Sequence, residues 1–437
     1  MLFRKAFADM LRWKNSPHKR ALLITGARQI GKTFLVRHFA KENYDSFIEL
    51  NFALDSDAAE IFAESHNPKD ILLRLSLRSS KPIVPKKTLF FFDEIQEAPE
   101  VLTAIKGLVD QGTYDYILSG SMLGVELRNI TSLPVGYVNT LVMHPLDFEE
   151  FCWALTGSRE IFSYLHDCFE KREKIDQVVN KQLNELFKKY IIVGGMPQAV
   201  QTFTQTSDIT LIREIQENIK NWYRTDISKY CPDSEKLKTR EAFDLIPAEL
   251  NNPNKRFVLK NLHENIRFRA FEDALLWLTH GDVANAAYNV TTPVSPLLIS
   301  KSRNLFKLFH ADTGILMSCY SKKVSEALLT EKSEVNFGAM FENAAAQEFV
   351  AHGFDLFYFN SKKYGELDFI LEDRDGKILP IEIKSGKDFK RHRALANILN
   401  VKDYQLKEGF VFGATNLFQE DNVTYLPIYM LSIFSNK

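Results

Sequence analysis

The chain has 437 residues, a formal net charge of -1, 45% hydrophobic residues and 25% charged residues. These values are ordinary for a globular protein and exclude a disordered chain. The near-neutral charge excludes a global attraction to nucleic acid or membranes, so any such affinity must come from local patches. The length predicts about three domains, each large enough to bury its own core. No apolar stretch of the sequence approaches the roughly 20 residues that a membrane-spanning helix needs.

The segment 1–20 contains six basic residues and one acidic residue, a composition similar to that of a targeting peptide. It lacks the uninterrupted apolar region and the cleavage site of such a peptide. We therefore expect a short helix over residues 2–13, packed on the N-terminal domain with its basic residues toward solvent. The four cysteines are widely separated and form no C-x-x-C pair, which favours neither a disulfide framework nor a zinc site. A reducing cytoplasm fits this usage best.

A glycine-rich segment follows the apolar run 21–25, where a strand should give way to a helix. It has the G-x-x-x-x-G-K-[ST] spacing of a P-loop (Walker A motif), in which glycines permit unusual backbone angles and successive N–H groups point at phosphates. The lysine of this motif reaches the β- and γ-phosphates, and the final hydroxyl ligates Mg²⁺. The alternative is an ordinary glycine turn. The residues predicted to bind the nucleotide are Gly26, Ala27, Arg28, Gln29, Ile30, Gly31, Lys32 and Thr33, with Phe34 at the start of the following helix.

A second apolar run, residues 88–92, ends in two carboxylates, Asp93 and Glu94. The run is typical of a central strand that is buried on both faces, and its C-terminal end is where an open α/β sheet binds ligands. We expect Asp93 to hold Mg²⁺ through water and Glu94 to polarise the water that attacks the γ-phosphate. The alternative is a strand that ends in a solvated acidic turn.

A third strand, residues 114–118, ends in small polar residues, and Ser119 or Ser121 is a candidate sensor of the γ-phosphate. Ser-Gly is also common turn chemistry, which leaves a plain turn as the alternative. No Asn-Lys-x-Asp segment is present to pair with a guanine ring, so the sequence favours ATP over GTP.

The residues up to about 155 alternate short apolar strands with helical stretches, which predicts a parallel sheet covered by helices. The expected strands lie near 21–25, 46–52, 88–92, 115–119 and 136–142. The fold class is therefore α/β, with a P-loop NTPase sheet at the N-terminus.

Residues 156–330 show mainly helical periodicity, with a clear break at the glycines and proline of 193–197. A polar, hairpin-like stretch at 286–300 separates an expected helix over 271–278 from another over 305–317. Helices with a small wing would satisfy this pattern, so we predict a winged-helix-like segment. A plain helical bundle is the alternative.

The third block, from about 331, begins with an expected helix over 337–350. Two strands follow, at 365–371 and 378–384, joined by an Asp-Gly hairpin signal. Strict alternation places Leu367 and Phe369 on one face of the first strand and Asp368 on the other. Glu382 and Lys384 likewise share one face of the second strand.

These faces allow Asp368, Glu382 and Lys384 to converge. Two carboxylates beside one ammonium form a Mg²⁺ site with a cation placed to orient water or stabilise a pentacovalent phosphate. Glu342, on the preceding helix, is a candidate for a further metal ligand. The alternative is a surface hairpin with alternating charges.

The whole chain resembles the AAA+-superfamily ATPases of bacteria and archaea in which an N-terminal P-loop domain is joined to a C-terminal domain of uncharacterised function with the PD-(D/E)xK restriction-endonuclease-like fold. The matching segments follow the family's order and are residues 26–33, 92–96, 118–121, 144–151, 194–197, 306–308, 312–314, 366–369 and 381–385. The expected domains are thus a P-loop ATPase domain (1–155), a helical or winged-helix-like domain (156–330) and a nuclease-like domain (331–437).

The resemblance implies ATP and Mg²⁺ at Lys32, Thr33, Asp93 and Glu94, and a nuclease-like triad at Asp368, Glu382 and Lys384 with Glu342 as the first-helix glutamate. One departure concerns the arginine finger. Many relatives carry Gly-Arg before the last strand of the ATPase block, where this chain has Gly136 and Tyr137. Arg128 and Arg224 are the alternatives for that role.

Three functions are compatible with these features. The first is an ATPase whose nucleotide state controls a Mg²⁺-dependent nuclease, and the second is a nucleotide-switched regulator that binds DNA, RNA or protein without cutting. The third is an assembly module, such as a homo-oligomer, that binds ATP for structure alone. A basic cluster beside the nuclease-like residues is a candidate for phosphate contacts, with a solvated helix face as its alternative, and consists of Lys384, Lys387, Lys390, Arg391 and Arg393.

Overall fold

The computed structural model describes residues 2–64, 67–79, 81–121, 136–253, 255–262, 268–330, 335–386 and 388–436. The chain divides into two compact units. The N-terminal unit comprises Phe3–His144 and His280–Asp282, and the C-terminal unit comprises Met1–Leu2, Pro145–Thr279 and Val283–Lys437. Among the described residues, no helix combines the length and the apolar character needed to cross a membrane.

The N-terminal unit is built on a five-stranded sheet with the order β2-β3-β4-β1-β5, in which every pair is parallel. This confirms the parallel α/β architecture predicted from the sequence. All six residues of β3 are buried, because helices cover both faces of a parallel sheet. The strands are β1 (Ala21–Thr25), β2 (Ser46–Asn51), β3 (Thr88–Asp93), β4 (Asp115–Ser119) and β5 (Val138–Val142).

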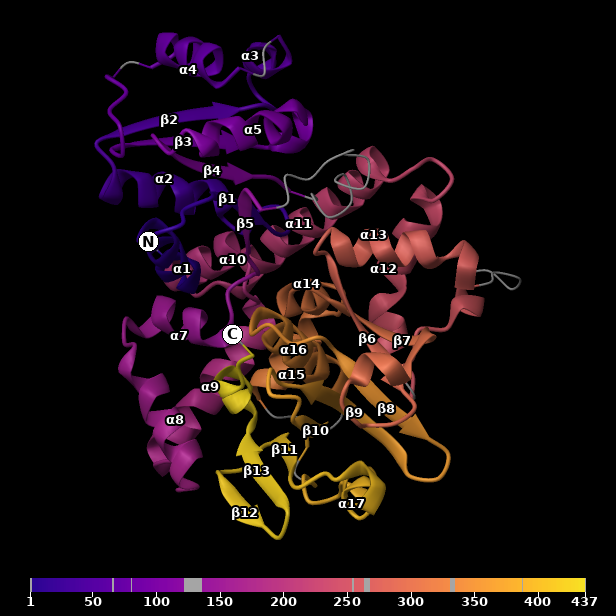
Figure 1. Ribbon diagram of the computed structural model, residues 1–437. Helices are drawn as coiled ribbons and strands as arrows, with labels where there is room; N and C mark the ends of the chain where they lie inside the picture. The colour runs from indigo at the N-terminus through magenta and orange to yellow at the C-terminus, as the bar shows by residue number, and fades with distance from the viewer. Residues whose placement is uncertain are drawn as a thin grey trace. The chain divides into compact units, whose positions relative to one another are not determined.

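Helices lie on both sides of this sheet (Figure 1). One apolar cluster joins α3, α4 and α5 to the strands, while α2 packs on β2, β3 and β4 from outside that cluster. The N-terminal helix α1 begins at Lys5 and packs on α2, where the rings of Phe7 and Phe39 lie 5.5 Å apart. The helices are α1 (Lys5–Lys14), α2 (Lys32–Asn43), α3 (Glu60–Ala63), α4 (Pro68–Leu77) and α5 (Glu100–Asp110), with short 3₁₀ turns at Ser56–Ala58 and Ile95–Glu97.

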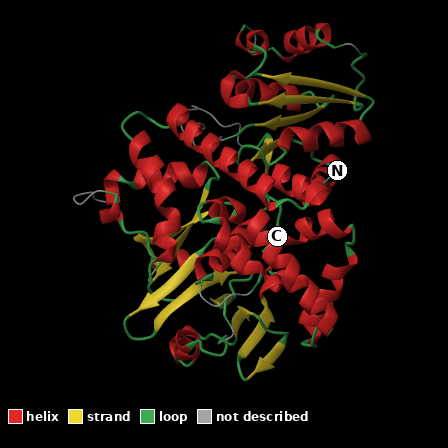
Figure 2. Ribbon diagram, turned by 180° about the vertical axis from the view of Figure 1, so that it is seen from behind, coloured by secondary structure: helices red, strands yellow, loops and turns green. Residues whose placement is uncertain are grey.

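The first part of the C-terminal unit is helical, as predicted (Figure 2). The expected break is present: α9 ends at Val193, Gly194 adopts φ 74°, and Pro197 starts α10, where its missing N–H costs no helical hydrogen bond. The helices are α7 (Phe148–Thr156), α8 (Glu160–Lys171), α9 (Gln177–Val193), α10 (Pro197–Thr206), α11 (Ile209–Tyr230), α12 (Lys236–Asn251) and α13 (Glu272–His280), with 3₁₀ turns at Leu259–Asn261 and Phe268–Ala270.

The expected helix over 305–317 is wrong in its first half. Residues 301–310 form a strand, β7 (Lys301–His310), which pairs antiparallel with β6 (Ala284–Val290), and the helix that follows is only α14 (Thr313–Ser318). The side chains from Phe306 to His310 are all buried, so both faces of the strand lie in the interior and the alternation that would mark a strand is missing.

The β6–β7 hairpin is also not a small separate wing. It forms one edge of an eight-stranded sheet with the order β12-β13-β11-β10-β9-β8-β6-β7. The two strands and the helix predicted after residue 337 are confirmed as β9, β10 and α16. The remaining elements are α15 (Lys322–Leu329), α16 (Gly338–Ala351), β8 (Phe357–Ser361), β9 (Gly365–Glu372), β10 (Ile378–Ile383), α17 (Arg393–Leu399), β11 (Gly409–Gly413), β12 (Phe418–Glu420), β13 (Val423–Pro427) and 3₁₀ turns at Leu297–Ser300, Lys402–Tyr404 and Ile428–Ile433.

This sheet takes strands from both sides of residue 330, the expected boundary between the second and third domains. The division into 1–155, 156–330 and 331–437 remains a prediction. The compact C-terminal unit already includes Pro145, because the segment at 146–151 is bonded to α16 of that unit.

The strict alternation expected along β9 is wrong. The register between β8 and β9 shifts by one residue, which is a β-bulge in β9 between Leu367 and Ile370. Leu367 and Ile370 therefore join the same apolar cluster beside α17. Phe369, expected to share a face with Leu367, packs instead on Phe349 of α16, with the rings 5.5 Å apart.

Three of the segments that carry the family resemblance meet in one buried junction of the C-terminal unit. The amide of Leu146 donates to the carbonyl of Gly195 at 2.7 Å, and the amide of Gly195 donates to Asp312 Oδ2 at 2.6 Å. A Cβ on Gly195 would lie 2.0 Å from the Leu146 carbonyl oxygen, so only glycine fits there. These motif residues hold the fold together and lie outside both candidate sites.

Candidate functional site

The loop between β1 and α2 has the backbone of a phosphate-binding loop. Gly26, Gln29 and Gly31 have φ values of 131°, 68° and 89°, which expose successive amides along the concave side of the turn. A Cβ on Gly26 would lie only 2.2 Å from the carbonyl oxygen of Met143, so the close approach of the last strand also demands glycine. The positive φ values belong to the β1–α2 loop that the sequence predicts, whereas the contact with Met143 depends on the packing of the segment after β5.

Lys32, the first residue of α2, folds back over this loop. Its Nζ donates to the carbonyl oxygens of Gly26 and Ala27, both at 2.8 Å, and the residue is only 7% exposed. Burial lowers the pKa of Lys32 to about 8, although the nearby carboxylates of Glu94 and Asp93 raise it. The ammonium is thus positioned inside the loop, where phosphate oxygens would meet it.

Asp93 lies at the C-terminal end of β3 and receives hydrogen bonds from three neighbouring elements. Thr33 Oγ1 donates to its Oδ2 at 2.9 Å, Asn51 Nδ2 donates to the same oxygen at 3.0 Å, and Ser119 Oγ donates to Oδ1. Ser119 can reach this carboxylate because β4 lies between β1 and β3 in the sheet. Burial raises the pKa of Asp93, and the hydrogen bonds from Ser119 and Thr33 oppose that rise.

Glu94 follows with φ 55°, a left-handed backbone conformation that ends the strand. Its Oε2 accepts hydrogen bonds from Ser121 Oγ at 3.0 Å and from Gln96 Nε2. Burial raises the pKa of Glu94, but the hydrogen bond from Gln96, the charge of Lys32 and the hydrogen bonds from Ser121 outweigh it and lower the pKa overall. The result is a half-buried carboxylate that stays ionised at neutral pH.

Several predicted residues contribute backbone alone. Ala27 and Ile30 are only 1% and 0% exposed, so their side chains face the core of the unit. Gln29 is exposed, and the ring of Phe34 is 60% exposed on the first turn of α2. Arg28 Nε donates to Ser121 Oγ at 3.1 Å, which connects the loop to the Glu94 carboxylate.

Sequence reasoning missed Asn51 and Gln96. A signal for Asn51 was available, since it ends β2 beside Asp93 at the same carboxyl edge of the sheet. The arginine-finger role stays a prediction: Arg128 lies outside the described residues, and Arg224 on α11 of the C-terminal unit donates to Asp244 at 2.8 Å.

The oxygen donors near the loop suit Mg²⁺. Thr33 Oγ1 and the Asp93 carboxylate lie within hydrogen-bonding distance of each other, and hydroxyl and carboxylate oxygens are the ligands that this hard cation prefers. Thr33 and Asp93 are therefore the residues of this unit that would hold it.

The predicted nuclease-like residues do come together in the C-terminal unit. Asp368 Oδ2 accepts the amide of Ile383 at 2.8 Å, and Lys384 Nζ donates to Glu382 Oε1 at 2.6 Å. Burial, followed by the charge of Asp368, raises the pKa of Glu382 to about 8, although Lys384 opposes this rise. The convergence expected from the hairpin is present despite the bulge.

Two lysines that the sequence did not single out enter the same cluster. Lys255 donates to Glu342 Oε1, and the fully buried Lys307 lies 2.7 Å from Glu366 Oε1 and 3.9 Å from Glu342 Oε2. Burial lowers the pKa of Lys255, while the charge of Asp368 raises it. A signal for Lys307 was its position as a lone charge within the apolar stretch 305–309.

The prediction of a Mg²⁺ site at Glu342, Asp368 and Glu382 does not fit this arrangement. Within the described ranges, no three His, Cys, Asp or Glu side chains are grouped so as to hold a metal ion. Lysine ammonium groups instead pair with Glu342, Glu366 and Glu382, and Lys307 among them is fully buried. We call Lys255, Lys307, Glu342, Glu366, Asp368, Glu382 and Lys384 the lysine–carboxylate cluster.

The basic residues after β10 have local partners. Lys390 lies 2.6 Å from Glu420, and Arg391 lies 3.8 Å from Asp388, while Lys387 falls outside the described residues. These pairs make the solvated-face alternative the simpler account of the predicted basic cluster.

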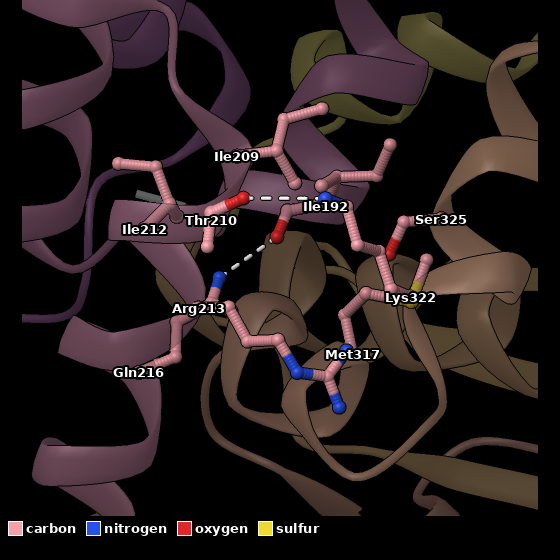
Figure 3. Close-up of a pocket in the computed structure, with 9 residues that line it drawn as sticks. All are labelled: Ile192, Ile209, Thr210, Ile212, Arg213, Gln216, Met317, Lys322 and Ser325. Carbon is pink, nitrogen blue, oxygen red and sulfur yellow. Dashed lines mark hydrogen bonds between the residues drawn. The ribbon is translucent and has the colours of Figure 1, made fainter.

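A small cavity of about 30 Å³ lies elsewhere in the C-terminal unit, between α9, α11 and α15 (Figure 3). Lys322 Nζ donates to Thr210 Oγ1 across it at 3.3 Å. This volume holds about one water molecule, so the cavity is a packing defect and not a ligand site.

Comparison with known protein families divides the chain into three matched stretches. Residues 18–152 match the model of an AAA domain, which contains the loop, Asp93 and Glu94 described above. We call the N-terminal unit, which this match covers from residue 18, the AAA domain. Beyond the AAA domain, residues 184–326 and 337–431 each match a domain of unknown function (DUF8612 and DUF4143).

Three solved structures similar to the chain are each distant in sequence. A Walker-type ATPase of Pyrococcus abyssi is 14% identical, with a TM-score of 0.42 over 73% of this chain and 96% of that one. The Orc1 protein of Aeropyrum pernix in complex with DNA is 15% identical, with a TM-score of 0.29 over 76% and 93%. The RuvB Holliday junction branch migration motor of Thermotoga maritima is 12% identical, with a TM-score of 0.30 over 75% and 95%. No curated protein sequence matches the chain.

Proposed function

We propose that the AAA domain hydrolyses ATP with the help of Mg²⁺. The observation that carries this proposal is a pair of neighbouring carboxylates at the end of β3 with different hydrogen-bond partners and opposite pKa shifts. Asp93 is hydrogen-bonded to the P-loop hydroxyl of Thr33, while Glu94 is kept ionised by Gln96, Lys32 and Ser121. A domain that bound ATP for structure alone would have no use for the second carboxylate.

Each residue has a distinct role in this proposal. The amides of residues 26–33 and the ammonium of Lys32 bind the β- and γ-phosphates, and Thr33 with Asp93 holds Mg²⁺. The cation supplies charge neutralisation to the phosphates. Glu94 accepts a hydrogen bond from the attacking water and takes its proton, because an ionised carboxylate can act as the base. Ser119 keeps the Asp93 carboxylate oriented, which makes it a positioning residue.

The test is ATP hydrolysis by the full chain, with binding measured separately. Glu94→Gln should retain ATP binding and lose about 100-fold or more in kcat, the range expected for a general base. Lys32→Ala should lose binding itself. Glu100→Gln, at an exposed position in the first turn of α5, is the matched control and should hydrolyse ATP normally. Wild-type kcat in Glu94→Gln would exclude the assigned base.

For the C-terminal unit, we favour a nucleotide-switched regulator that binds nucleic acid without cutting it, over a Mg²⁺-dependent nuclease. The specific observation is that two lysines outside the predicted triad pair with acids of the lysine–carboxylate cluster: Lys255 bonds to Glu342, and Lys307 lies 2.7 Å from Glu366. A nuclease of this type needs its carboxylates free to bind the metal ion. ATP binding and hydrolysis in the AAA domain would set how strongly the C-terminal unit holds its partner.

Cleavage and binding assays separate the two candidates. The regulator predicts DNA or RNA binding that changes with ATP, and no Mg²⁺-dependent strand breakage. Breakage that persists in Lys32→Ala but is lost in both Glu382→Ala and Lys384→Ala would instead establish the nuclease.

A further inference from the structure

A large cavity opens in the C-terminal unit next to Lys384. Its volume is about 630 Å³, which lies within the range of roughly 300 to 1,000 Å³ that small-molecule sites occupy. It is lined by residues of α9, α15, residues 335–337, the first turn of α16 and the segments that follow β10, β11 and β13. Neither the AAA domain nor the interior of the lysine–carboxylate cluster contributes to it, apart from Lys384 itself.

The position of the cavity is that of a ligand site. Strands β10, β11 and β13 are mutually parallel, so their carboxyl ends lie along one edge of the sheet. Ser385 follows the end of β10 and lines the cavity there. In open α/β sheets, ligands bind outside the carboxyl ends of parallel strands.

The cavity is lined by both charged and aromatic side chains. Lys188 of α9 and Lys384, which also bonds to Glu382, supply two cations, and Asp388 adds one carboxylate to the lining. Phe337 and Phe341 supply apolar surface with 8% and 7% of each residue exposed, and the fully buried Phe187 supports Phe341 at a ring distance of 6.4 Å. Asn336 adds an amide at the rim. A ligand that matches these walls carries a phosphate for the lysines and a flat, partly polar ring for the phenylalanines.

We propose that this cavity binds a nucleoside monophosphate unit, either free or as the 5′-phosphorylated end of a nucleic acid strand. The phosphate lies between Lys188 and Lys384, and the base lies against Phe337 and Phe341. The proposal deepens the regulator function proposed for the C-terminal unit and rests on it, since it names the chemical group that the unit would hold. It requires no cleavage and no metal ion.

The test uses the full chain carrying Lys32→Ala, so that the P-loop does not contribute to binding. The probes are thymidine 5′-monophosphate, the 5′-phosphorylated dinucleotide of thymidine and the same dinucleotide with a 5′-hydroxyl, each titrated by calorimetry. None of them has the β- and γ-phosphates that the P-loop recognises. We expect both phosphorylated probes to bind and the 5′-hydroxyl dinucleotide to bind at least 10-fold more weakly. Tighter binding of the phosphorylated dinucleotide than of the mononucleotide identifies a strand end as the ligand, and equal binding identifies a free nucleotide.

Two further substitutions locate the binding. Lys188→Ala should weaken the phosphorylated probes about 10-fold, and Ser385→Trp should block them by filling the cavity. Lys189→Ala removes an exposed lysine from the next position of the same helix and should leave binding unchanged. No binding of any probe to the folded protein overturns the proposal, as does binding that neither Lys188→Ala nor Ser385→Trp alters.

ATP hydrolysis by the wild-type chain is measured independently, so failure here leaves the ATPase proposal standing. Loss of ATP-dependent binding to long DNA and RNA, with the monophosphates still bound, would remove the regulator function alone.

Discussion

Thr33 Oγ1 donates a hydrogen bond to Asp93 Oδ2 at 2.9 Å, which ties the first turn of α2 to the C-terminal end of β3. The same carboxylate is also held by Asn51 from β2 and by Ser119 from β4. Four elements of the AAA domain thus fix one carboxylate, and its position depends on the order of the strands.

Removing the Ser119 hydroxyl should therefore weaken Mg²⁺ binding. Its hydrogen bond opposes the burial that raises the pKa of Asp93, so Ser119→Ala should raise that pKa further and free the carboxylate to rotate. Loss of such a supporting contact typically costs 10- to 100-fold in metal affinity. We expect the Mg²⁺ concentration for half-maximal ATP hydrolysis to rise about 10-fold. Ser76→Ala, an exposed serine on α4, is the control; an unchanged Mg²⁺ dependence in Ser119→Ala would contradict the assignment.

ATP binding should take up a proton above pH 8. Burial lowers the pKa of Lys32 to about 8, so the ammonium is largely charged at pH 7 and largely neutral at pH 9. Phosphate oxygens favour the charged form, and binding therefore restores the proton at pH 9. Calorimetry in buffers with different ionisation enthalpies should show close to one proton taken up at pH 9 and little at pH 7. Equal uptake at both values would show that Lys32 is not the group that titrates.

Asp312 should make the folded state less stable as the pH rises from about 4 to about 6. Burial raises its pKa to about 6 from 3.8, although hydrogen bonds from Gly195 and Ile315 oppose the rise. The folded state then binds the proton more tightly than the unfolded state, so its ionisation costs about 3 kcal/mol above pH 6 and nothing below pH 4.

The variant Asp312→Asn should lose the pH dependence of the unfolding free energy that comes from the ionisation of Asp312. Its unfolding free energy is expected to fall overall, since asparagine offers a donor where Gly195 needs an acceptor. The difference from wild type should however shrink as the pH rises through the interval. Denaturant titrations at pH 4, 5, 6 and 7 measure this difference, with the exposed Asp403→Asn as control. A difference independent of pH would contradict the prediction.

Lys255 should compete with divalent cations in the lysine–carboxylate cluster. Its ammonium bonds to Glu342, and the charge of Asp368 also acts on it. Replacing it by methionine leaves the buried Glu342 without this counter-ion. The affinity of the site for another cation should then increase. We expect Lys255→Met to gain Mn²⁺ or Mg²⁺ binding that wild type lacks, measured by calorimetry without nucleotide. Lys260→Met, at an exposed site nearby, should gain none. Equal metal binding by wild type and Lys255→Met would show that the lysine does not exclude the ion.

The nucleotide-site residues of the AAA domain could be predicted because each belongs to a short segment with a recognisable sequence pattern. The glycine loop, the buried strand before Asp93 and the small residues after β4 are each short, continuous segments whose pattern implies their position at one sheet edge. The bulge in β9 and the strand at 301–310 could not be predicted in the same way. The bulge depends on how β8 pairs with β9, and the strand is buried on both faces, which removes its alternation.

The sequence by itself determined the parallel sheet, the P-loop and the convergence of Asp368, Glu382 and Lys384, because each follows from neighbours within one or two elements. Only the tertiary structure decided that Lys255 and Lys307 fill the carboxylate cluster, and that Asn51 and Ser119 share Asp93. Lys255 and Glu342 are 87 positions apart in the chain. Such a pair is set by how helices and strands pack in three dimensions, and no spacing along the sequence encodes it.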